Sequence, residues 1–478
     1  MPILSARDII KIAQCLDQAN TLIATAREIL SNSTQEPETA REPEPIEPEP
    51  VEEIEQEMTN ELEPAGMTPE NETEEIEPEP VQTKEVSCQE LVKDTGFYAS
   101  FDNWKTLYNA LKFTMQAINK RSTLPITCNV CMVGRLDKVT FTTTDLEVGI
   151  ELTIQSDSSA CQGIITLASG PLCEMLKAIK PASIIIKSSS ETSASVILDG
   201  EEQILPAIAG EEFPFPSINQ NTWDKVFSLD SGELKELQTI TAPAVLPFAS
   251  TDRNARPELA GILTIVGESN IFLISTDGSR LAHAVQSASE IRKPGEYLIP
   301  THTLKILQSA KSEVLDVFTE GERIYFQGDN FTIVSRLIQS RFPNWKVVIP
   351  KLEDVKYEFA LSTESMSRAL ACLKPATKDN KRIECELFVD GITLKAGNAD
   401  SGIISQHLLS KIQVATLPED PIIFGINHAF LSDVIASAPC NGTIRMQYTG
   451  DMRPVLFKAP GDDTVDGYYS IVMPLRDR

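Results

Sequence analysis

Three features of the sequence predict an α+β protein with three repeated domains behind an N-terminal extension. The charge is uneven: residues 1–94 hold 24 Asp or Glu against 6 Lys or Arg, whereas the rest of the chain holds 45 against 36. Helix-like and strand-like segments recur at intervals of about 130 residues. Between the helix-like segments, apolar and polar residues alternate, as they do in strands. Paired helices packed on antiparallel sheets are the architecture that fits this order.

The chain opens with a candidate helix. The stretch ILSARDIIKIAQCLDQANTLIATAREIL (Ile3–Leu30) has apolar residues at roughly helical spacing, including Ile9, Ile12, Leu16 and Ile23. We expect an amphipathic helix over residues 1–32. Two interpretations remain open: a marginal helix that packs on nothing, or a tethered helix that binds a partner or self-associates.

A Glu- and Pro-rich segment follows, over residues 33–95. It contains EPETAREPEPIEPEPVEEIEQE (residues 36–57) and is almost free of aromatic residues. Such a composition buries too little apolar surface to offset the entropy of ordering, so it predicts a disordered, self-repelling linker. The net charge of residues 1–94 is −18, so the acidity of the protein is mostly a property of this extension.

Bulk composition favours a soluble cytoplasmic protein. No stretch approaches the roughly 18 consecutive apolar residues of a membrane span. Asp8 and Lys11 interrupt the apolar residues at the N-terminus, which differs from a secretory signal. Nine scattered cysteines suggest reduced thiols rather than a disulfide framework.

Two hairpin-like stretches support the repeat. IFLISTDGSRLAHAV (Ile271–Val285) has an Asp-Gly turn signal between two β-prone runs, and FTTTDLEVGIEL (Phe141–Leu152) has a Thr-Asp pair 132 residues earlier. A weaker third copy places Asp400 a further 123 residues on. The recurrence predicts that Asp145 and Asp277 form turns and are not paired catalytic carboxylates.

Helix starts and Phe-Pro pairs give the expected boundaries. Asp102, Asp230 and Ser362 stand where N-caps belong, and Asp230 with Glu233 fits a capping box. Phe-Pro pairs 129 residues apart end the first two units. The expected domains therefore cover residues 96–224, 225–353 and 354–478.

Catalysis has little support in the sequence. Four histidines are widely spaced, and no HExxH, Gly-x-Ser-x-Gly or GxxxxGK[ST] motif occurs. Cys128 and Cys131 have metal-like spacing but lack a second pair or a nearby histidine. We expect no catalytic residue, no cofactor and no metal. The alternative is a hydrolase or transferase built on repeated α+β domains.

Basic residues fall on the expected helices. Solvated helix faces are one interpretation, and a lining that contacts phosphate backbones without reading bases is the other. The candidates for such contacts are Lys105, Lys112, Lys177, Lys235, Lys305 and Arg368.

Four motifs carry a resemblance to a known family. NKRSTLPITCNV (119–130), STDGSRLA (275–282), RFPNW…VIP (341–350) and SIVMPLR (470–476) resemble the bacterial β sliding clamp, the beta subunit of DNA polymerase III. The resemblance covers residues 96–478 and leaves the extension outside. It implies a non-catalytic ring, formed by a head-to-tail homodimer, that encircles double-stranded DNA without base readout. The implied partners are the replicative polymerase, the clamp loader and other proteins with clamp-binding motifs, with no membrane.

The resemblance also implies site residues. A pocket for partner peptides would lie between the second and third domains, where Leu, Val, Met and Pro bury apolar anchors and Arg pairs with acidic or carbonyl groups. Its expected residues are Leu259, Thr276, Gly278, Arg280, Leu281, Pro343, Val348, Asn427, Phe430, Val472, Met473, Pro474, Leu475 and Arg476. DNA contacts are implied for Arg121 and Arg256.

The acidic extension lies outside the resemblance, and two roles are open for it. Its charge could compete with DNA for the basic lining or deter loose contact with nucleic acid. Recruitment of a partner by Ile3–Leu30 is equally open.

Overall fold

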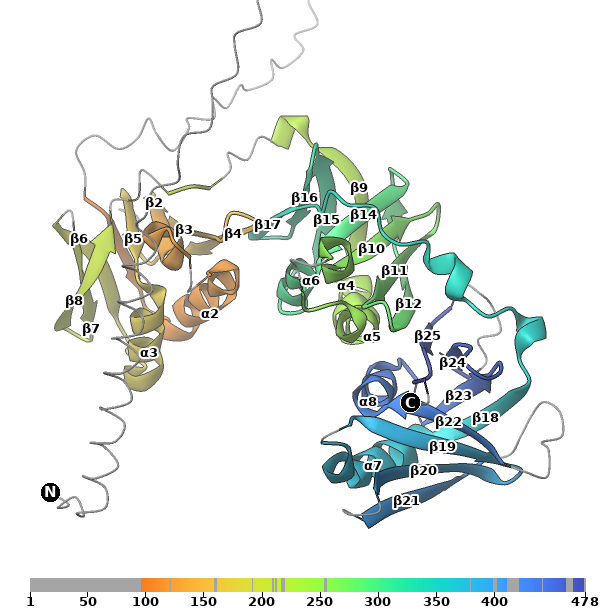
Figure 1. Cartoon of the computed structure of the whole chain (residues 1–478). Helices are drawn as coiled ribbons and strands as arrows, with labels where there is room; N and C mark the ends of the chain where they lie inside the picture. The colour runs from red at the N-terminus through yellow and green to blue at the C-terminus, as the bar shows by residue number, and fades with distance from the viewer. Residues whose placement is uncertain are drawn as a thin grey trace, which may run out of the picture. The chain divides into compact units, whose positions relative to one another are not determined.

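The computed structural model describes most of the chain from residue 96 to residue 476 (Figure 1). The described ranges are 96–119, 122–158, 161–190, 192–208, 210, 213–215, 220–252, 256–378, 380–398, 402–410, 421–440, 442–460 and 467–476. The helix expected over 1–32 and the linker expected over 33–95 lie outside these ranges.

The described chain repeats one order of elements three times: a strand, a helix or helical segment, four strands, a helix and three strands, with one extra two-residue strand, β13, in the second unit. The first unit comprises β1 (Tyr98–Phe101), α2 (Trp104–Thr114), β2 (Val130–Arg135), β3 (Lys138–Thr144), β4 (Val148–Gln155), β5 (Ile164–Leu167), α3 (Ser169–Ile179), β6 (Ile184–Ser190), β7 (Ser193–Leu198) and β8 (Glu201–Ile208). Short 3-10 turns, η1 (Met115–Ala117) and η2 (Pro125–Cys128), follow α2.

The second unit replaces its first helix by a run of short helical segments. It comprises β9 (Asp224–Asp230), α4 (Ser231–Glu236), η5 (Leu237–Thr241), α5 (Ala242–Val245), η6 (Leu246–Phe248), η7 (Pro257–Ala260), β10 (Gly261–Val266), β11 (Asn270–Thr276), β12 (Arg280–Ser287), β13 (Glu290–Ile291), β14 (Gly295–Pro300), α6 (Thr301–Leu307), β15 (Val314–Glu320), β16 (Arg323–Gln327) and β17 (Phe331–Arg336). The segment η5 is a π-helix, and η4 (Gln220–Thr222) precedes the unit.

The third unit follows a connector that contains two 3-10 turns, η8 (Trp345–Val348) and η9 (Leu352–Asp354). It comprises β18 (Tyr357–Ser362), α7 (Thr363–Leu373), η10 (Lys374–Thr377), β19 (Arg382–Phe388), β20 (Gly391–Asn398), β21 (Gly402–Leu409), β22 (Ile422–Asn427), α8 (His428–Ser437), β23 (Thr443–Tyr448), β24 (Val455–Lys458) and β25 (Tyr469–Val472).

Two sheets cross from one unit to the next. The 13-stranded sheet has the order β1-β6-β7-β8-β5-β2-β3-β4-β17-β16-β15-β9-β13 and joins the first two units where β4 pairs with β17. The 8-stranded sheet has the order β14-β10-β11-β12-β25-β24-β23-β18 and joins the second and third units where β12 pairs with β25. A 4-stranded sheet, β21-β20-β19-β22, completes the third unit. We call the two junctions the first seam and the second seam.

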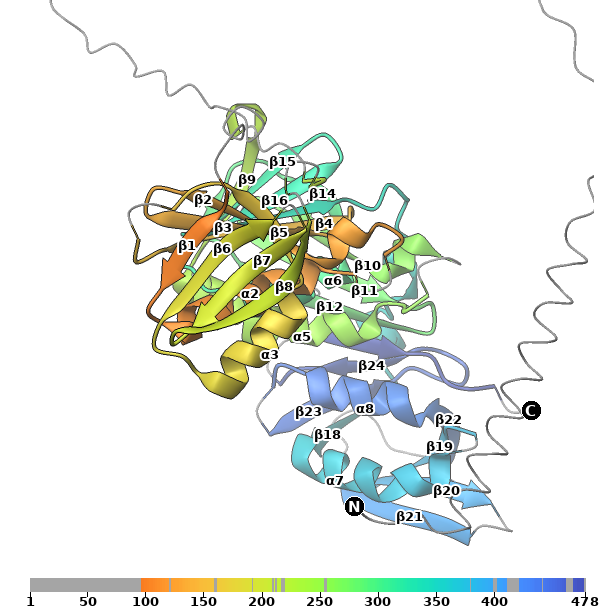
Figure 2. The same ribbon diagram turned by 90° about the vertical axis from the view of Figure 1, so that its left-hand side faces the viewer.

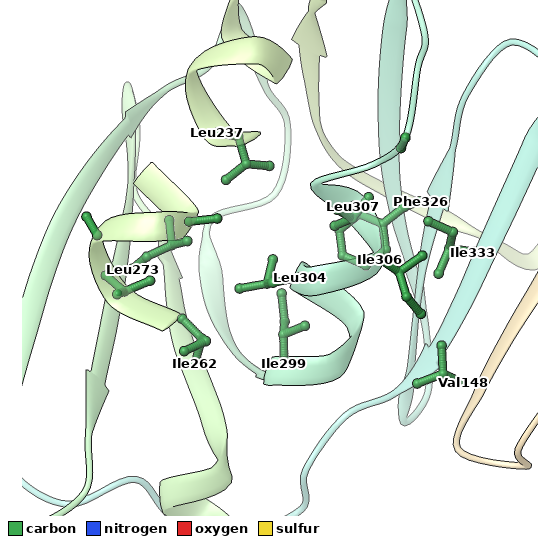
Figure 3. Packing of buried hydrophobic residues seen from close by; sticks show 14 of the residues in the cluster. Val148, Leu237, Ile262, Leu273, Ile299, Leu304, Ile306, Leu307, Phe326 and Ile333 are labelled. Carbon is green, nitrogen blue, oxygen red and sulfur yellow. The ribbon is translucent and has the colours of Figure 1, made fainter. Parts of the chain in front are cut away.

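Helices pack in pairs on one face of these strands (Figures 1 and 2). The helices α2 and α3 contact each other in the first unit, and α7 and α8 do so in the third. The facing residues Leu107, Leu111, Leu172 and Leu176 are fully buried, as apolar residues at helical spacing predict. In the second unit, Leu304, Ile306 and Leu307 of α6 supply the equivalent core (Figure 3).

The predicted fold class is confirmed: helices lie on antiparallel sheets in three repeated units. The capping box of Asp230 and Glu233 is present, and Ser362 caps α7 by accepting from the Ser365 amide at 3.2 Å. The cap expected at Asp102 was wrong by one residue. Asn103 caps α2 instead, because its side chain accepts from the amides of the second and third residues after it. The exact domain boundaries remain predictions.

Candidate functional site

The Thr276-Asp277 turn is held entirely by its own side chains. The Thr276 hydroxyl donates to the Arg280 carbonyl at 2.6 Å and accepts from the Gly278 amide at 3.0 Å. Oδ1 of Asp277 accepts from the amides of Ser279 and Arg280 at 2.9 and 3.1 Å. Both polar side chains are therefore used in shaping the hairpin.

The first unit contains the same turn. The Thr144 hydroxyl bonds the Val148 carbonyl and the Leu146 amide, and Oδ1 of Asp145 accepts from the amides of Glu147 and Val148. Bond for bond, this network matches that of Thr276 and Asp277. Both aspartates form turns, as predicted. The matching residue of the third unit, Asp400, lies outside the described residues.

Arg280 leaves the turn and joins the second unit to the third. Its Nε donates to Oδ2 of Asp277 at 2.9 Å, and its Nη1 donates to Oδ2 of Asp433 on α8 at 2.5 Å. Its Nη2 donates to the carbonyl of Pro247 at 2.7 Å. The guanidinium also lies 5.2 Å from the ring centre of Phe248 and 4.4 Å from that of Phe430.

The Arg280 side chain is only 9% exposed. Three hydrogen bonds and two nearby aromatic rings hold it in position. In this structure it acts as a strut between the two units. The sequence predicts a donor at the rim of a pocket, whereas all of the donor groups described above already have partners.

The C-terminal segment runs beside this strut. Val472 pairs with Arg280 across the second seam, and the next amide, that of Met473, donates to the Ser279 carbonyl at 2.9 Å. Leu475 then bonds Gly425 on β22 at 2.8 Å. Met473 is 36% exposed, whereas Pro474 is buried. An exposed thioether therefore sits between the hairpin and the third unit.

The connector between the second and third units packs on the same seam. A small apolar cluster includes Leu281 of β12 and Ile471 of β25, and the connector residues Phe342, Trp345 and Ile349 cover it. Leu281 is only 3% exposed, because the connector residues pack over the cluster that contains it. Val348, also on the connector, is 40% exposed and is available to a ligand.

The remaining expected pocket residues lie around this seam with different exposure. Leu259 and Thr276 are buried, Phe430 contacts the strut, and Asn427 caps α8 by accepting from the Ala429 amide. Gly278, Pro343 and Arg476 are exposed, and Leu475 is half-buried. The contacts thus bring together the hairpin, α8 and the C-terminal segment, while the connector covers the outer side of the seam.

Sequence reasoning missed four residues of this arrangement: Phe248, Asp433, His283 and Trp345. Phe248 and Asp433 contact Arg280, as described above. His283 stacks on Tyr469 with ring centres 4.6 Å apart and lies 5.6 Å from Trp345. The sequence contains no local signal for them, because Asp433 is 153 residues from Arg280.

The lysines expected on the helix layer are exposed. Lys105 and Lys112 lie on α2, Lys177 on α3, Lys235 on α4 and Lys305 on α6. Among the described residues, none of the five forms a salt bridge; Lys105 lies 6.0 Å from the Trp104 ring centre. Arg368 on α7 is exposed and pairs with Glu364 at 3.1 Å, one turn away.

Several basic residues on the strands have carboxylate partners. Lys225 bonds Glu290 and Asp316 at 3.1 and 3.0 Å. Lys395 pairs with Glu386, and Arg445 approaches Glu358. Several basic residues of the sheets are therefore paired with carboxylates, whereas the five helix lysines form no salt bridge within the described residues; the same is true there of Lys138 on β3 and Lys187 on β6.

The two arginines expected to contact DNA are placed differently. Arg121 lies outside the described residues. Arg256 is exposed, and its Nη1 is 3.8 Å from where a Cβ on Gly278 would be. It therefore lies beside the hairpin turn of the second seam and not on a helix, so its DNA contact remains a prediction.

The first seam has a cavity of about 610 Å³ at its turn end. Its wall includes Leu146, Glu147, Arg323 and Arg336. It is more polar than the second seam, where the apolar cluster and the connector lie.

Within the described residues, no group of three or more His, Cys, Asp or Glu side chains is arranged to hold a metal ion. In the same part of the chain, no helix is long and apolar enough to cross a bilayer.

Repeated α+β units joined through shared sheets, with unpaired lysines on the helices, define a clamp-type protein. The family descriptions "DNA polymerase III beta subunit, N-terminal domain" and "central domain" match residues 103–218 and 233–344. The chain therefore belongs to the bacterial β sliding clamp family.

Known relatives agree with this membership. The beta sliding clamp of Staphylococcus aureus is 22% identical over 377 residues, covering 77% of this chain and 96% of the relative. The clamp of Staphylococcus epidermidis is 21% identical over 382 residues, with the same coverage. Among solved structures, the beta subunit of Thermotoga maritima has a TM-score of 0.71 at 19% identity, covering 80% of this chain and all of its own. The Bacillus subtilis clamp has a TM-score of 0.70 at 20% identity, with the same coverage.

Proposed function

We propose that this chain is a DNA sliding clamp that encircles duplex DNA, confers processivity on a replicative polymerase and docks its partners through the second seam. It is a processivity subunit and not a catalyst. The observation that carries the DNA contact is the set of five exposed lysines on the helices, which form no salt bridge within the described residues.

Exposed lysines without fixed partners suit a sliding contact. An ammonium group on a flexible stem can follow successive phosphates without a fixed geometry, unlike a bidentate arginine. Phosphate contacts carry no sequence information, and they weaken steeply with salt because bound counterions are released. Several weak and interchangeable contacts hold the protein near DNA and still allow it to slide.

The partner pocket is proposed for the region where the hairpin, α8, the connector and the C-terminal segment meet. Met473 and Val348 are its exposed apolar groups. An adaptable thioether suits partners with different apolar anchors. Arg280 positions the pocket wall by holding α8 against the hairpin, and the Arg476 side chain is exposed at the end of the segment.

Ring closure is proposed through two strand edges. Among the described strands, β21 pairs only with β20, and β8 is covered by β5 only at its last two residues. A second copy of the chain can pair the two edges antiparallel. Large apolar side chains stand exposed on both, with Ile204 60% exposed and Ile403 66% exposed.

The two internal seams suggest the register of this third seam. Gly149 is opposite Val334 in the first seam, and Leu281 is opposite Ile471 in the second. Matching the strands within each sheet makes Ile403 equivalent to Leu281 and Ile204 equivalent to Val334. The proposed interface therefore places Ile403 of one copy opposite Ile204 of the other, on the face away from the helices.

The test is stimulation of long-product synthesis by a cognate polymerase on primed circular DNA. Lys105→Gln, Lys112→Gln and Lys177→Gln together are expected to lower stimulation and the salt slope of DNA binding. The matched control replaces three lysines that lie outside the helices and likewise form no salt bridge within the described residues: Lys138, Lys187 and Lys356. Equal behaviour of the two triple variants would contradict the proposed DNA surface.

The pocket is tested by the same assay with Met473→Ala and Val348→Ala. Both side chains are partly exposed, so their loss leaves the core intact. Leu281→Ala is less informative, because Leu281 lies under the connector in the apolar cluster. Val347→Ala is the control, since Val347 is 73% exposed and adjacent to Val348.

A bacterial replication clamp works on chromosomal DNA, so we also propose a cytoplasmic location.

A further inference from the structure

The acidic extension has no part in the function proposed above. Residues 36–79 hold 18 Glu and a single basic residue, Arg41, which gives a net charge of −17 over 44 residues. Eight prolines are interspersed among these glutamates. This much negative charge is covalently attached to a body whose helices carry unmatched positive charge.

We propose that residues 36–79 bind the exposed lysines of α2 and α3 when DNA is absent, as an intramolecular competitor of DNA. The proposal rests on the DNA contact assigned above to the same lysines. It concerns the regulation of that surface and involves no covalent chemistry.

Charge complementarity selects the surface. Lys105 and Lys112 lie two turns apart on α2, about 10 Å along the axis at 1.5 Å per residue. Lys177 and Lys180 extend the positive charge onto α3, which packs against α2. Glutamates two residues apart, as in the Glu-Pro-Glu stretches, are about 6 Å apart in an extended Pro-rich chain. Such a segment can place a carboxylate near each ammonium in many alternative alignments.

The attachment point favours this contact. The described chain begins at residue 96, enters β1 at Tyr98, and reaches the α2 cap at Asn103. Residues 80–95 can span about 50 Å when extended, at roughly 3.3 Å per residue. The acidic segment is therefore tethered within reach of α2. Tethering of this kind gives the acidic segment an effective concentration on the order of millimolar at the lysines of α2.

DNA is nevertheless the stronger ligand. Duplex DNA carries one charge per about 1.7 Å of axis. The acidic segment carries about one negative charge per 7–8 Å of its length when it is extended at roughly 3.1 Å per residue. Encircled duplex therefore displaces the segment, whereas weak lateral contact with nucleic acid does not. Because both interactions are electrostatic, the competition is strongest at low salt and disappears as salt rises.

The first test compares the full-length protein with a variant in which the 18 glutamates of residues 36–79 are changed to glutamine. A second variant with the same residues scrambled keeps charge and length. Affinity for a short linear duplex is measured at about 50 and 200 mM salt. The neutralised variant is expected to bind about fivefold more tightly or better at low salt, with the gap closing at high salt. The scrambled variant is expected to match the native protein.

Equal affinity of the native and neutralised proteins at low salt would overturn the proposal. So would a scrambled variant that behaves like the neutralised one, because the effect would then depend on sequence and not on charge. Zero-length carbodiimide cross-linking maps the contact: products joining glutamates of 36–79 to Lys105, Lys112 or Lys177 are expected, and added duplex should remove them. Cross-links confined to Lys293 or Lys351 would place the segment elsewhere and contradict the assignment.

The same variants separate this inference from the proposed function. With the neutralised segment as background, Lys105→Gln, Lys112→Gln and Lys177→Gln are expected to weaken DNA binding. If these changes have no effect in that background, the DNA surface itself is wrong. If they weaken binding while neutralisation alone changes nothing, the DNA surface stands and only the competition fails.

Discussion

Arg280 of β12 and Asp433 of α8 form an ion pair with a separation of 2.5 Å between Nη1 and Oδ2, and this pair ties the second unit to the third. Arg280→Ala would leave Asp277, Asp433 and the Pro247 carbonyl without their shared donor. Because the arginine is 9% exposed and Asp433 is 41% exposed, we expect a loss of about 2–4 kcal/mol in unfolding free energy. Urea denaturation measures it.

Two variants control that experiment. Arg280→Lys keeps the charge but loses the planar fork, so it should recover only part of the stability. Arg368→Ala removes an exposed pair with Glu364 and should cost no more than about 0.5 kcal/mol. An Arg280→Ala protein as stable as Arg368→Ala would show that the strut does not hold the units together.

The matching turns of the first two units predict opposite effects of opposite substitutions: a glycine introduced in one turn stabilises the protein, and a glycine removed from the other destabilises it. Leu146 and Gly278 occupy the same turn position, with φ of 77° and 92°. Leucine is strained there and is 56% exposed, so Leu146→Gly should stabilise the protein by about 1 kcal/mol.

Gly278→Ala should destabilise the protein by about 1 kcal/mol, through backbone strain alone. The nearest atom to an added Cβ is Nη1 of Arg256, at 3.8 Å, so there is no clash. Thermal unfolding of the Leu146→Gly and Gly278→Ala variants measures both changes in stability. The same sign of effect in both would mean that the two turns are not equivalent.

The proposed ring interface predicts a specific cross-link. Ile204→Cys in one copy and Ile403→Cys in another should form a disulfide between copies on mild oxidation, because directly opposite residues have Cα atoms about 4.5–5.5 Å apart. Mixing the two single variants should give a covalent dimer on non-reducing gels. Ile204→Cys mixed with Ser405→Cys is the control, since a shift of two residues separates the pair by about 7–8 Å. More product from the control would reject this register.

The lowered pKa of Glu290 predicts how the stability of the protein falls at acid pH. Hydrogen bonds from Arg292 and Lys225 lower the pKa of Glu290 to about 2. A carboxyl whose folded pKa is lowered contributes stability that is fully present above its ordinary pKa of 4.5 and is lost as the pH falls towards 2. Denaturation midpoints of the native protein and Glu290→Gln should therefore differ most above pH 4.5 and converge near pH 2. A difference that is constant across this range would contradict the pKa assignment.

Local signals in the sequence were sufficient for the repeat and for the turns. Thr-Asp pairs and cap residues satisfy groups within four residues of themselves, and the alternation of a strand is visible in adjacent residues. Asp277 could therefore be assigned to a turn from its neighbours in the chain. The shift from Asp102 to Asn103 at the α2 cap shows the limit, since neighbouring cap-forming residues compete for the same helix end.

Burial and partner choice could not be obtained in this way. Arg280 was expected at a pocket rim, but its partners on η6 and α8 are 33 and 153 residues away in the chain and are brought to it by the fold. Leu281 was expected to face a ligand, and the connector covers it. The unmatched state of the helix lysines likewise depends on which carboxylates the fold brings near.

By itself, the sequence determined the three-unit α+β organisation, the family membership of the body and the separation of an acidic extension from a mildly acidic body. These properties depend on composition, period and short motifs. The tertiary structure alone decided which residues of the second seam remain exposed and which act as struts. The physical reason is that exposure, ion pairing and strand edges are set by contacts between segments that are far apart along the chain.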